Sequence, residues 1–154
     1  MKGWLLDTNV VVELMRPQAT RRVLAWGAHL RPTEVFLSVL TLGEFDKGLH
    51  NLPADSPMRP KAANDIVALE RRFADRLLSV SDTVVRRWGD LSGRVKQATR
   101  QSPPVIDTLL AATALEHDLY LATRNVRDVA GTGAALFNPW DDDPALFPLK
   151  SRRM

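Results

Sequence analysis

The amino-acid sequence predicts an α/β protein built as one domain around a parallel sheet. Short apolar segments at residues 4–6, 35–39 and 119–123 alternate with longer segments of helical periodicity. Strands that alternate with helices in this way pair in parallel, with helices covering both faces of the sheet. The length of 154 residues is typical of a single domain and allows a core that needs no disulfide or metal to stabilise it.

The bounds of the expected elements follow from apolar spacing and from the prolines. We expect strands at residues 4–6, 35–39, 78–80, 119–123 and 136–138. We expect helices at residues 10–15, 20–30, 41–49, 62–78, 83–99 and 106–116. The proline-containing segments 51–60 and 101–104 are expected to be loops. Residues 1–140 should form the domain, and residues 141–154 a flexible C-terminal tail.

The residue composition excludes several classes of site. The sequence has no cysteine, which excludes disulfides, thiolate zinc sites and cysteine nucleophiles. Its 3 histidines are far apart, so a histidine-rich zinc site is not expected, and any metal would be a hard cation held by carboxylates. Lys and Arg number 21 against 18 Asp and Glu, and the resulting net charge of +3 permits a nucleic-acid partner without requiring one.

The N-terminal segment does not have the pattern of an export signal. Its apolar run is interrupted by Asp7, Asn9 and Glu13. No apolar stretch elsewhere approaches the roughly 18 residues that a membrane-spanning helix needs. We therefore expect the protein to be neither secreted nor inserted into a membrane. We expect it to be cytoplasmic.

Four acidic residues occupy comparable positions in the expected elements. Asp7 follows the first strand, and Asp128 lies a few residues past the strand at 119–123. Glu44 and Asp107 each fall in the first turn of an expected helix. In a parallel α/β sheet, ligands bind in the crevice beyond the carboxyl ends of the strands. Carboxylates gathered there repel one another, and their pKa values are raised unless a cation compensates them.

Such an acid cluster indicates a particular chemistry. Mg²⁺ and Mn²⁺ suit the cluster because both ions prefer oxygen ligands and keep several bound waters. The ion lowers the pKa of a bound water, which becomes a hydroxide nucleophile, and it stabilises the charge that grows on a phosphoryl oxygen. Four acids without histidine or cysteine therefore favour phosphodiester chemistry over peptide or ester chemistry.

Each acid also has a structural explanation. Asp7 could be the N-cap of the helix that follows it. Thr41 and Glu44 have the spacing of a capping box, and Asp107 in a first helical turn is favoured by the helix dipole. Asp128 could cap a turn. Taken singly, the structural explanation is stronger for Glu44 and Asp128, whereas the matching positions of all four acids favour a functional site.

Basic and aromatic side chains give weaker indications. The basic residues in or just after the helix expected at 83–99 are consistent with either a solvated face or a phosphate-binding rim. The tryptophans Trp26, Trp88 and Trp140 are interpreted as core or dimer contacts rather than as platforms for stacking RNA bases.

Five motifs in register resemble the PIN-domain superfamily. They are Leu5-Leu6-Asp7-Thr8-Asn9-Val10, Thr41-Leu42-Gly43-Glu44-Phe45, Ile106-Asp107-Thr108-Leu109-Leu110-Ala111-Ala112-Thr113-Ala114, Ala122-Thr123-Arg124-Asn125-Val126-Arg127-Asp128 and Phe137-Asn138-Pro139-Trp140. Within the superfamily, the chain resembles the VapC and FitB type of toxin from bacterial toxin–antitoxin pairs. The resemblance extends over residues 3–140.

The resemblance implies a fold, an activity and partners. The fold is a three-layer α/β/α arrangement whose parallel sheet of four to five strands has the order 3-2-1-4-5. The activity is that of an endoribonuclease dependent on Mg²⁺ or Mn²⁺, and the substrate is RNA. The implied partners are a second copy of the chain in a homodimer and a small antitoxin that inhibits the toxin. A larger toxin–antitoxin complex would bind operator DNA through the antitoxin.

The resemblance also implies which residues hold the metal and carry catalysis. The family's first three acids correspond to Asp7, Glu44 and Asp107. Many relatives carry the fourth acid at the position of Asn125, so we assign that carboxylate to Asp128, with Asn125 as a polar helper. The Thr8 hydroxyl either supports the site or caps the first helix.

Two other functions are compatible with the same class of fold. A phospho-acceptor receiver domain also gathers acids around Mg²⁺, but it needs paired acids at the first strand and a lysine near the last one. Residues 1–15 have no such pair and residues 119–140 contain no lysine. A catalytically silent PIN-like module that only binds RNA or protein is the remaining alternative, and the presence of all four acids counts against it.

Overall fold

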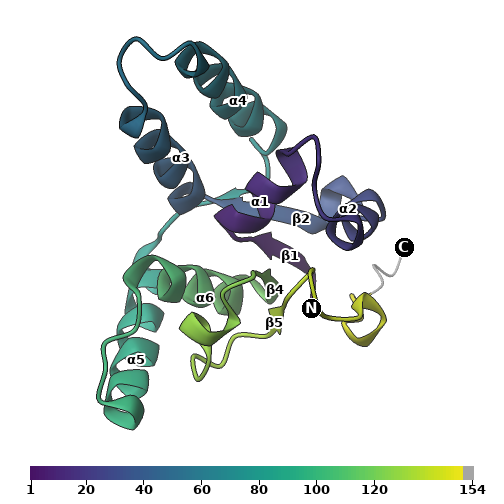
Figure 1. Ribbon diagram of the computed structural model, residues 1–154. Coiled ribbons are helices and arrows are strands. Elements are labelled where there is room, and N and C mark those ends of the chain that lie inside the picture. Colours follow the sequence, from purple (N-terminus) through teal and green to yellow (C-terminus); the bar gives the residue numbers. More distant parts are fainter. Residues whose placement is uncertain (151–154) are drawn as a thin grey trace.

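The computed structural model describes residues 1–150 and contains a five-stranded sheet between layers of helices (Figure 1). The strands are β1 (Gly3–Leu6), β2 (Val35–Ser38), β3 (Leu77–Leu78), β4 (Leu119–Ala122) and β5 (Leu136–Phe137). They lie in the order β3-β2-β1-β4-β5, and every neighbouring pair is parallel. The fold class and the strand order 3-2-1-4-5 are therefore confirmed.

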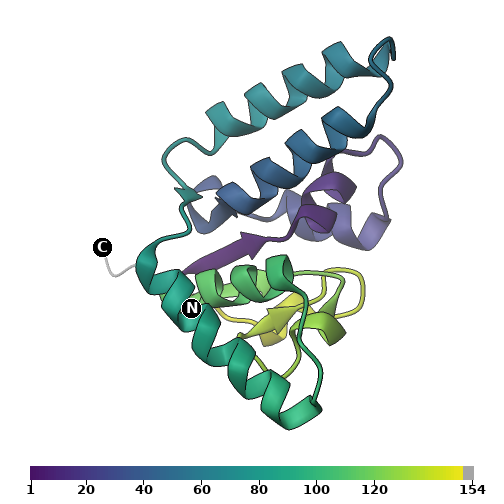
Figure 2. The same cartoon turned by 90° about the vertical axis from the view of Figure 1, so that its left-hand side faces the viewer.

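In the described part of the chain, six α-helices surround the sheet. They are α1 (Thr8–Met15), α2 (Arg21–Ala28), α3 (Val39–Asn51), α4 (Met58–Arg72), α5 (Asp82–Thr99) and α6 (Val105–His117). Short 3-10 helices are present at Pro32–Glu34, Val126–Val129 and Pro144–Leu146. Within residues 1–150, no helix is both long enough and apolar enough to span a membrane. Figure 2 shows α3 and α4 as an antiparallel pair at one end of the molecule, and α5 and α6 at the other.

The two faces of the sheet have separate cores because side chains alternate along each strand. On β1, Trp4 and Leu6 belong to a cluster that includes Trp26 of α2. Leu5 points to the opposite face, where it packs with Leu110 of α6. The central strand is thus covered on both sides, which explains its uninterrupted apolar sequence.

The segment after α4 differs from the expected helix at 62–78. Helix α4 ends at Arg72, and Leu77 and Leu78 form strand β3 beside β2. The Arg76 guanidinium donates hydrogen bonds to the carbonyl oxygens of Val35 (3.0 Å) and Arg72 (2.7 Å), and also to that of Pro32. These contacts hold the chain against β2, so the apolar spacing that placed Leu77 in phase with the helix was misleading.

Part of the C-terminal segment, for which a tail is expected from residue 141, packs against the rest of the domain. Phe147 and Leu149 pack against the core cluster of the first face. The Tyr120 hydroxyl donates a hydrogen bond (3.0 Å) to a backbone carbonyl of the same segment. These apolar side chains thus contact a surface that includes the N-terminal strand. Residues 151–154 lie outside the described residues.

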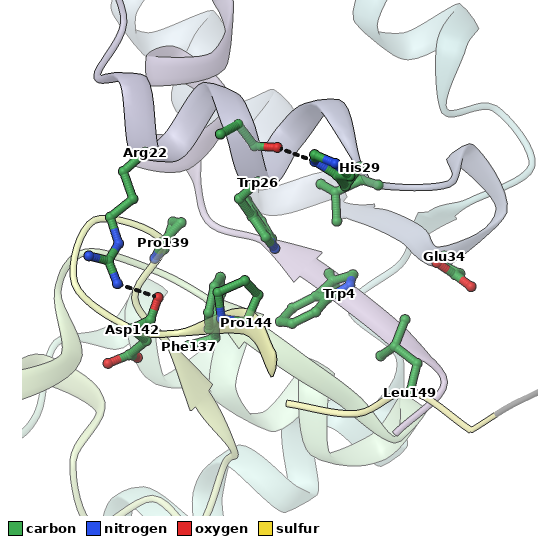
Figure 3. Close-up of a pocket in the computed structure, with 12 residues that line it drawn as sticks. Trp4, Arg22, Trp26, His29, Glu34, Phe137, Pro139, Asp142, Pro144 and Leu149 are labelled. Carbon is green, nitrogen blue, oxygen red and sulfur yellow. Dashed lines mark hydrogen bonds between the residues drawn. The ribbon is translucent and has the colours of Figure 1, made fainter. Parts of the chain in front are cut away.

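A cavity of about 500 Å³ lies between α2 and this C-terminal segment (Figure 3). Its apolar wall includes Trp4, Trp26 and Phe137. The Arg22 guanidinium crosses from α2 to the backbone carbonyl of Asp142, at 3.1 Å. None of the four acids singled out above lines this cavity.

Candidate active site

The register of the sheet brings neighbouring strand ends to the same level. Leu6 is paired with Ala122, and Ala122 is paired with Phe137. The Asp7 amide donates to the Ala122 carbonyl (2.9 Å), and the Thr123 amide donates to the Phe137 carbonyl (2.9 Å). Asp7 and Thr123 therefore leave the sheet side by side at its carboxyl edge, where α/β proteins bind ligands.

Asp7 is buried at this edge and its carboxylate is held by three donors. Oδ1 accepts the Thr8 backbone N–H (2.7 Å), while Oδ2 accepts the Thr123 hydroxyl (2.7 Å) and the Asn9 side-chain amide (3.2 Å). Burial raises the pKa of Asp7, and the charge of Glu44 adds to the effect, against the opposing influence of these hydrogen bonds. Asp7 is also the N-cap of α1, so the same carboxylate both caps a helix and belongs to the acid cluster.

Glu44 is linked to the first motif and does not form a capping box. The Thr8 hydroxyl donates a hydrogen bond to Glu44 Oε1 (2.8 Å) and lies 3.2 Å from the Thr41 hydroxyl. Helix α3 begins at Val39, and Ser38 is its N-cap. Thr41 is therefore already inside the helix, and the capping explanation for Glu44 is wrong. The side chain of Thr8 contacts Glu44, while the carboxylate of Asp7 provides the cap.

Asp107 and Asp128 approach the same edge from the other side of the molecule. Asp107 lies in the first turn of α6 and is half-buried, whereas Asp128 is exposed in the 3-10 helix Val126–Val129. Burial raises the pKa of Asp107 to about 6, with further contributions from the charges of Asp7, Asp128 and Glu44, in that order. The charges of the three other acids thus all reach Asp107, and the charge of Glu44 also reaches Asp7.

The donor set suits a hard divalent cation, although it is not a closed cage. Within residues 1–150, no three acidic, histidine or cysteine side chains lie close enough together to hold one ion between them. In the same residues, no lysine or arginine forms an ion pair with any of the four acids. Mg²⁺ is commonly held by only one or two carboxylates, while water completes its coordination shell. An open arrangement of oxygen donors such as this one is compatible with that mode of binding.

Three further polar residues lie close to the acids. Thr123 and Asn9 both donate to Asp7 Oδ2, a role that could not be assigned to either residue from the sequence. Their positions in the motifs were visible, but only the strand register shows that they meet the same carboxylate. Asn125 is exposed, and its backbone N–H donates to the Thr123 hydroxyl at 3.0 Å.

Comparison with known proteins decides the family. The model of the family described as PIN domain matches residues 4–130. This chain belongs to the PIN-domain family. The PIN domain described here is similar to Toxin FitB of Neisseria gonorrhoeae, with 33% identity over 90% of this chain and 99% of the relative.

Two further comparisons agree with this assignment. The VapC ribonuclease Y4jK of Sinorhizobium fredii is 29% identical, over 89% of this chain and 97% of the relative. The solved structure of FitAB bound to an IR36 DNA fragment contains a chain with a TM-score of 0.79 and 30% identity to this PIN domain. That match covers 91% of this chain and 97% of the solved one.

Proposed function

We propose that this PIN domain is an endoribonuclease dependent on Mg²⁺ or Mn²⁺ and the toxin of a toxin–antitoxin pair. The observation that carries the proposal is the electrostatic coupling of Asp107 to Asp7, Asp128 and Glu44 at the carboxyl edge of the sheet. Uncompensated carboxylates repel an RNA phosphate, so the phosphate that is to be cleaved can lie against the acids only with a cation between them. The similarity to a VapC ribonuclease supports RNA as the substrate.

Asp7, Glu44, Asp107 and Asp128 are the residues that would hold the ion. When bound, the ion supplies a water of lowered pKa and stabilises the charge on a phosphoryl oxygen. The donors to Asp7 Oδ2 fix the orientation of that carboxylate, while Oδ1, which accepts one hydrogen bond, keeps a lone pair for a further partner. The Thr8 hydroxyl similarly restrains Glu44 through Oε1.

The proposed partners follow from the similarity to Toxin FitB and to a FitAB complex on DNA. We infer that a small antitoxin inhibits this chain and that the joint complex contacts operator DNA through the antitoxin. We further infer a homodimer and action in the cytoplasm. Sedimentation at micromolar concentration tests the homodimer, and growth of cells that express the chain without an antitoxin tests its toxicity. A monomer would contradict the homodimer, and the absence of any growth defect would contradict the role as a toxin.

The activity is tested by incubating the protein with total RNA and Mg²⁺ or Mn²⁺, with EDTA as the control. The ends of the fragments are then mapped. We expect discrete cuts that EDTA prevents and that disappear in Asp7→Asn and Asp107→Asn, because each change removes a negatively charged oxygen donor. Cuts that persist in both variants would contradict the proposal. RNA binding without any cleavage would instead support a catalytically silent module.

A further inference from the structure

An arginine and a tryptophan form a cation–π pair at the edge of the sheet that carries the acids. The guanidinium carbon of Arg124 lies 4.9 Å from the centroid of the Trp140 ring. Arg124 follows β4 and Trp140 follows β5, two strands that are paired so that Ala122 faces Phe137. The pair therefore lies beyond the carboxyl end of the sheet, on the side of Asp7 that faces β5.

The tryptophan belongs to a turn with many internal hydrogen bonds. Asn138 Oδ1 accepts the Trp140 backbone N–H (3.0 Å), and the Asn138 backbone N–H donates to the Asp142 carboxylate (2.7 Å). The Arg22 guanidinium donates to the backbone carbonyls of Asp141 (2.9 Å) and Asp142 (3.1 Å), as Figure 3 shows for Asp142. The ring is thus presented by a fixed piece of backbone rather than by a free loop.

The arginine backbone is connected to the residues that hold Asp7. The Arg124 N–H donates to Asn9 Oδ1 (3.3 Å), and the Asn9 amide donates in turn to Asp7 Oδ2 (3.2 Å). The preceding residue, Thr123, donates its hydroxyl to the same carboxylate oxygen (2.7 Å). The position of Arg124 is therefore coupled to that of Asp7 through two short chains of contacts.

The charge of Arg124 is not used within the described part of the chain. Arg124 is exposed, and among residues 1–150 its guanidinium forms no ion pair and donates no hydrogen bond. Stacking on an aromatic ring restrains a guanidinium without neutralising it, and leaves its N–H groups available in the plane. A restrained arginine of this kind suits a phosphate, which it binds with two parallel hydrogen bonds.

We propose that Arg124, positioned by Trp140, binds a backbone phosphate of RNA beside the acid cluster. The inference rests on the proposed ribonuclease function. Arg124 contacts the substrate in this arrangement, whereas Trp140 is a positioning residue that acts through Arg124. Trp140 also packs against the core cluster of the first face, so this role is added to its interpretation as a core contact.

The first test measures RNA binding apart from cleavage. A fluorescently labelled single-stranded RNA of mixed sequence is titrated with the full chain in EDTA, over a series of salt concentrations, and anisotropy is followed. Arg124→Ala should weaken binding by about tenfold, the size of one lost charged hydrogen-bonding partner. The slope of log affinity against log salt should fall by about 0.7, which corresponds to one phosphate on a single strand. Arg71→Ala, an exposed arginine on α4, is the matched control and should change neither quantity.

The second test asks whether Trp140 acts through Arg124. Trp140→Leu should weaken binding in the same direction as Arg124→Ala, and the double variant should be no worse than Arg124→Ala alone. Trp140→Phe keeps an aromatic face and should restore most of the affinity. Arg124→Lys keeps the charge but loses the planar guanidinium, so it should restore the salt slope more than the affinity. Melting temperatures of all variants establish that each is folded.

Two results would overturn the inference in distinguishable ways. If the wild-type protein binds RNA and Arg124→Ala behaves like Arg71→Ala, Arg124 is not a phosphate-binding residue and the proposed ribonuclease function is unaffected. If the wild-type protein neither binds nor cleaves RNA with Mg²⁺ or Mn²⁺ present, the proposed function fails and this inference fails with it. Additive effects of the two substitutions would remove the positioning role of Trp140.

Discussion

The folded protein without metal favours the protonated form of Asp107 more strongly than the unfolded chain does. Burial and the neighbouring acids raise its pKa from 3.8 to about 6. Between these two values the folded state binds more protons than the unfolded state, so the stabilisation by protonation is complete below the unfolded pKa and is lost as the pH rises through about 6. The ionised side chain therefore destabilises the fold near neutral pH.

Replacing this carboxylate should stabilise the metal-free protein. In EDTA near neutral pH, we expect Asp107→Asn to raise the free energy of unfolding by about 1 kcal/mol, a value reduced to allow for solvent screening. At about pH 4 the gain should vanish, because the wild-type carboxyl is then largely protonated. Thermal unfolding over a pH series measures both. A variant less stable than the wild type at neutral pH would show that the favourable interaction of Asp107 with the helix dipole outweighs the repulsion.

Asp128 and Asn125 should differ in their effect on metal binding. Asp128 contributes charge at Asp107, whereas Asn125 carries none. Asp128→Ala should therefore lower Mn²⁺ affinity by about three- to tenfold, a moderate loss because the side chain is exposed. Asn125→Ala should change the affinity much less. Calorimetric titration measures the affinity, and raised Mn²⁺ should partly restore cleavage by Asp128→Ala. A lower melting temperature with an unchanged titration would assign Asp128 a purely structural role.

At the level of single residues, the sequence was informative about charges and less so about hydrogen bonds. The four acids could be placed together because strand ends of a parallel sheet share one edge. The capping box was a wrong interpretation because its position depended on where α3 begins, and helix bounds are uncertain by a residue or two. Thr123 and Asn9 were missed as partners of Asp7, since contacts between strands depend on register.

At the level of elements, the turn between α4 and β3 shows how one side chain can end a helix and begin a strand. Besides its hydrogen bonds to three backbone carbonyls, Arg76 lies over the Phe73 ring, 4.8 Å from the guanidinium carbon to the ring centroid. The sequence offers no sign of this, because an arginine in helical phase looks like a solvated residue. The acceptors belong to another part of the chain, and only the folded structure brings them within reach.

Removing this arginine should loosen the β2–β3 edge. We expect Arg76→Ala to lower the free energy of unfolding by about 2 kcal/mol, since it leaves several carbonyls without their donor and uncovers Phe73. Arg76→Lys should recover only part of this loss, because an ammonium group cannot reach all the carbonyls in the same planar arrangement. Chemical denaturation measures the change. Arg71→Ala on the exposed surface of α4 is the control, and an equal effect of the two alanine substitutions would contradict this account.

For the whole molecule, local patterns were sufficient to predict the α/β class. They did not predict the strand order or the packing of the C-terminal segment. Alternating strands and helices are visible within short windows of sequence, whereas the strand order was expected only through the family resemblance. The packing of residues 141–150 depends on an aromatic surface formed by β1, β4 and β5. A segment rich in aspartate and proline does not indicate such a surface, because the residues that it contacts are far away in the sequence.

The packing of the C-terminal segment, residues 141–150, against the aromatic surface should contribute measurably to stability. The Phe147 ring lies 4.9 Å from that of Phe137, 5.3 Å from that of Tyr120 and 6.5 Å from that of Trp4, between ring centroids. Phe147→Ala should lower the free energy of unfolding by about 2 kcal/mol, at the low end of the range for aromatic truncation because the ring is only half-buried. Urea unfolding followed by tryptophan fluorescence measures the change.

The neighbouring residue Leu146 provides the matched control for Phe147→Ala. Leu146 is 76% exposed, so Leu146→Ala should leave stability within about 0.5 kcal/mol of the wild type. Cleavage of RNA by Phe147→Ala should persist at temperatures where the variant is folded, because its ring contacts the core behind the acid edge rather than the acids. Equal stabilities for the two variants would mean that the C-terminal segment adds nothing to the fold. A loss of cleavage in folded Phe147→Ala would instead show that this segment also controls the site.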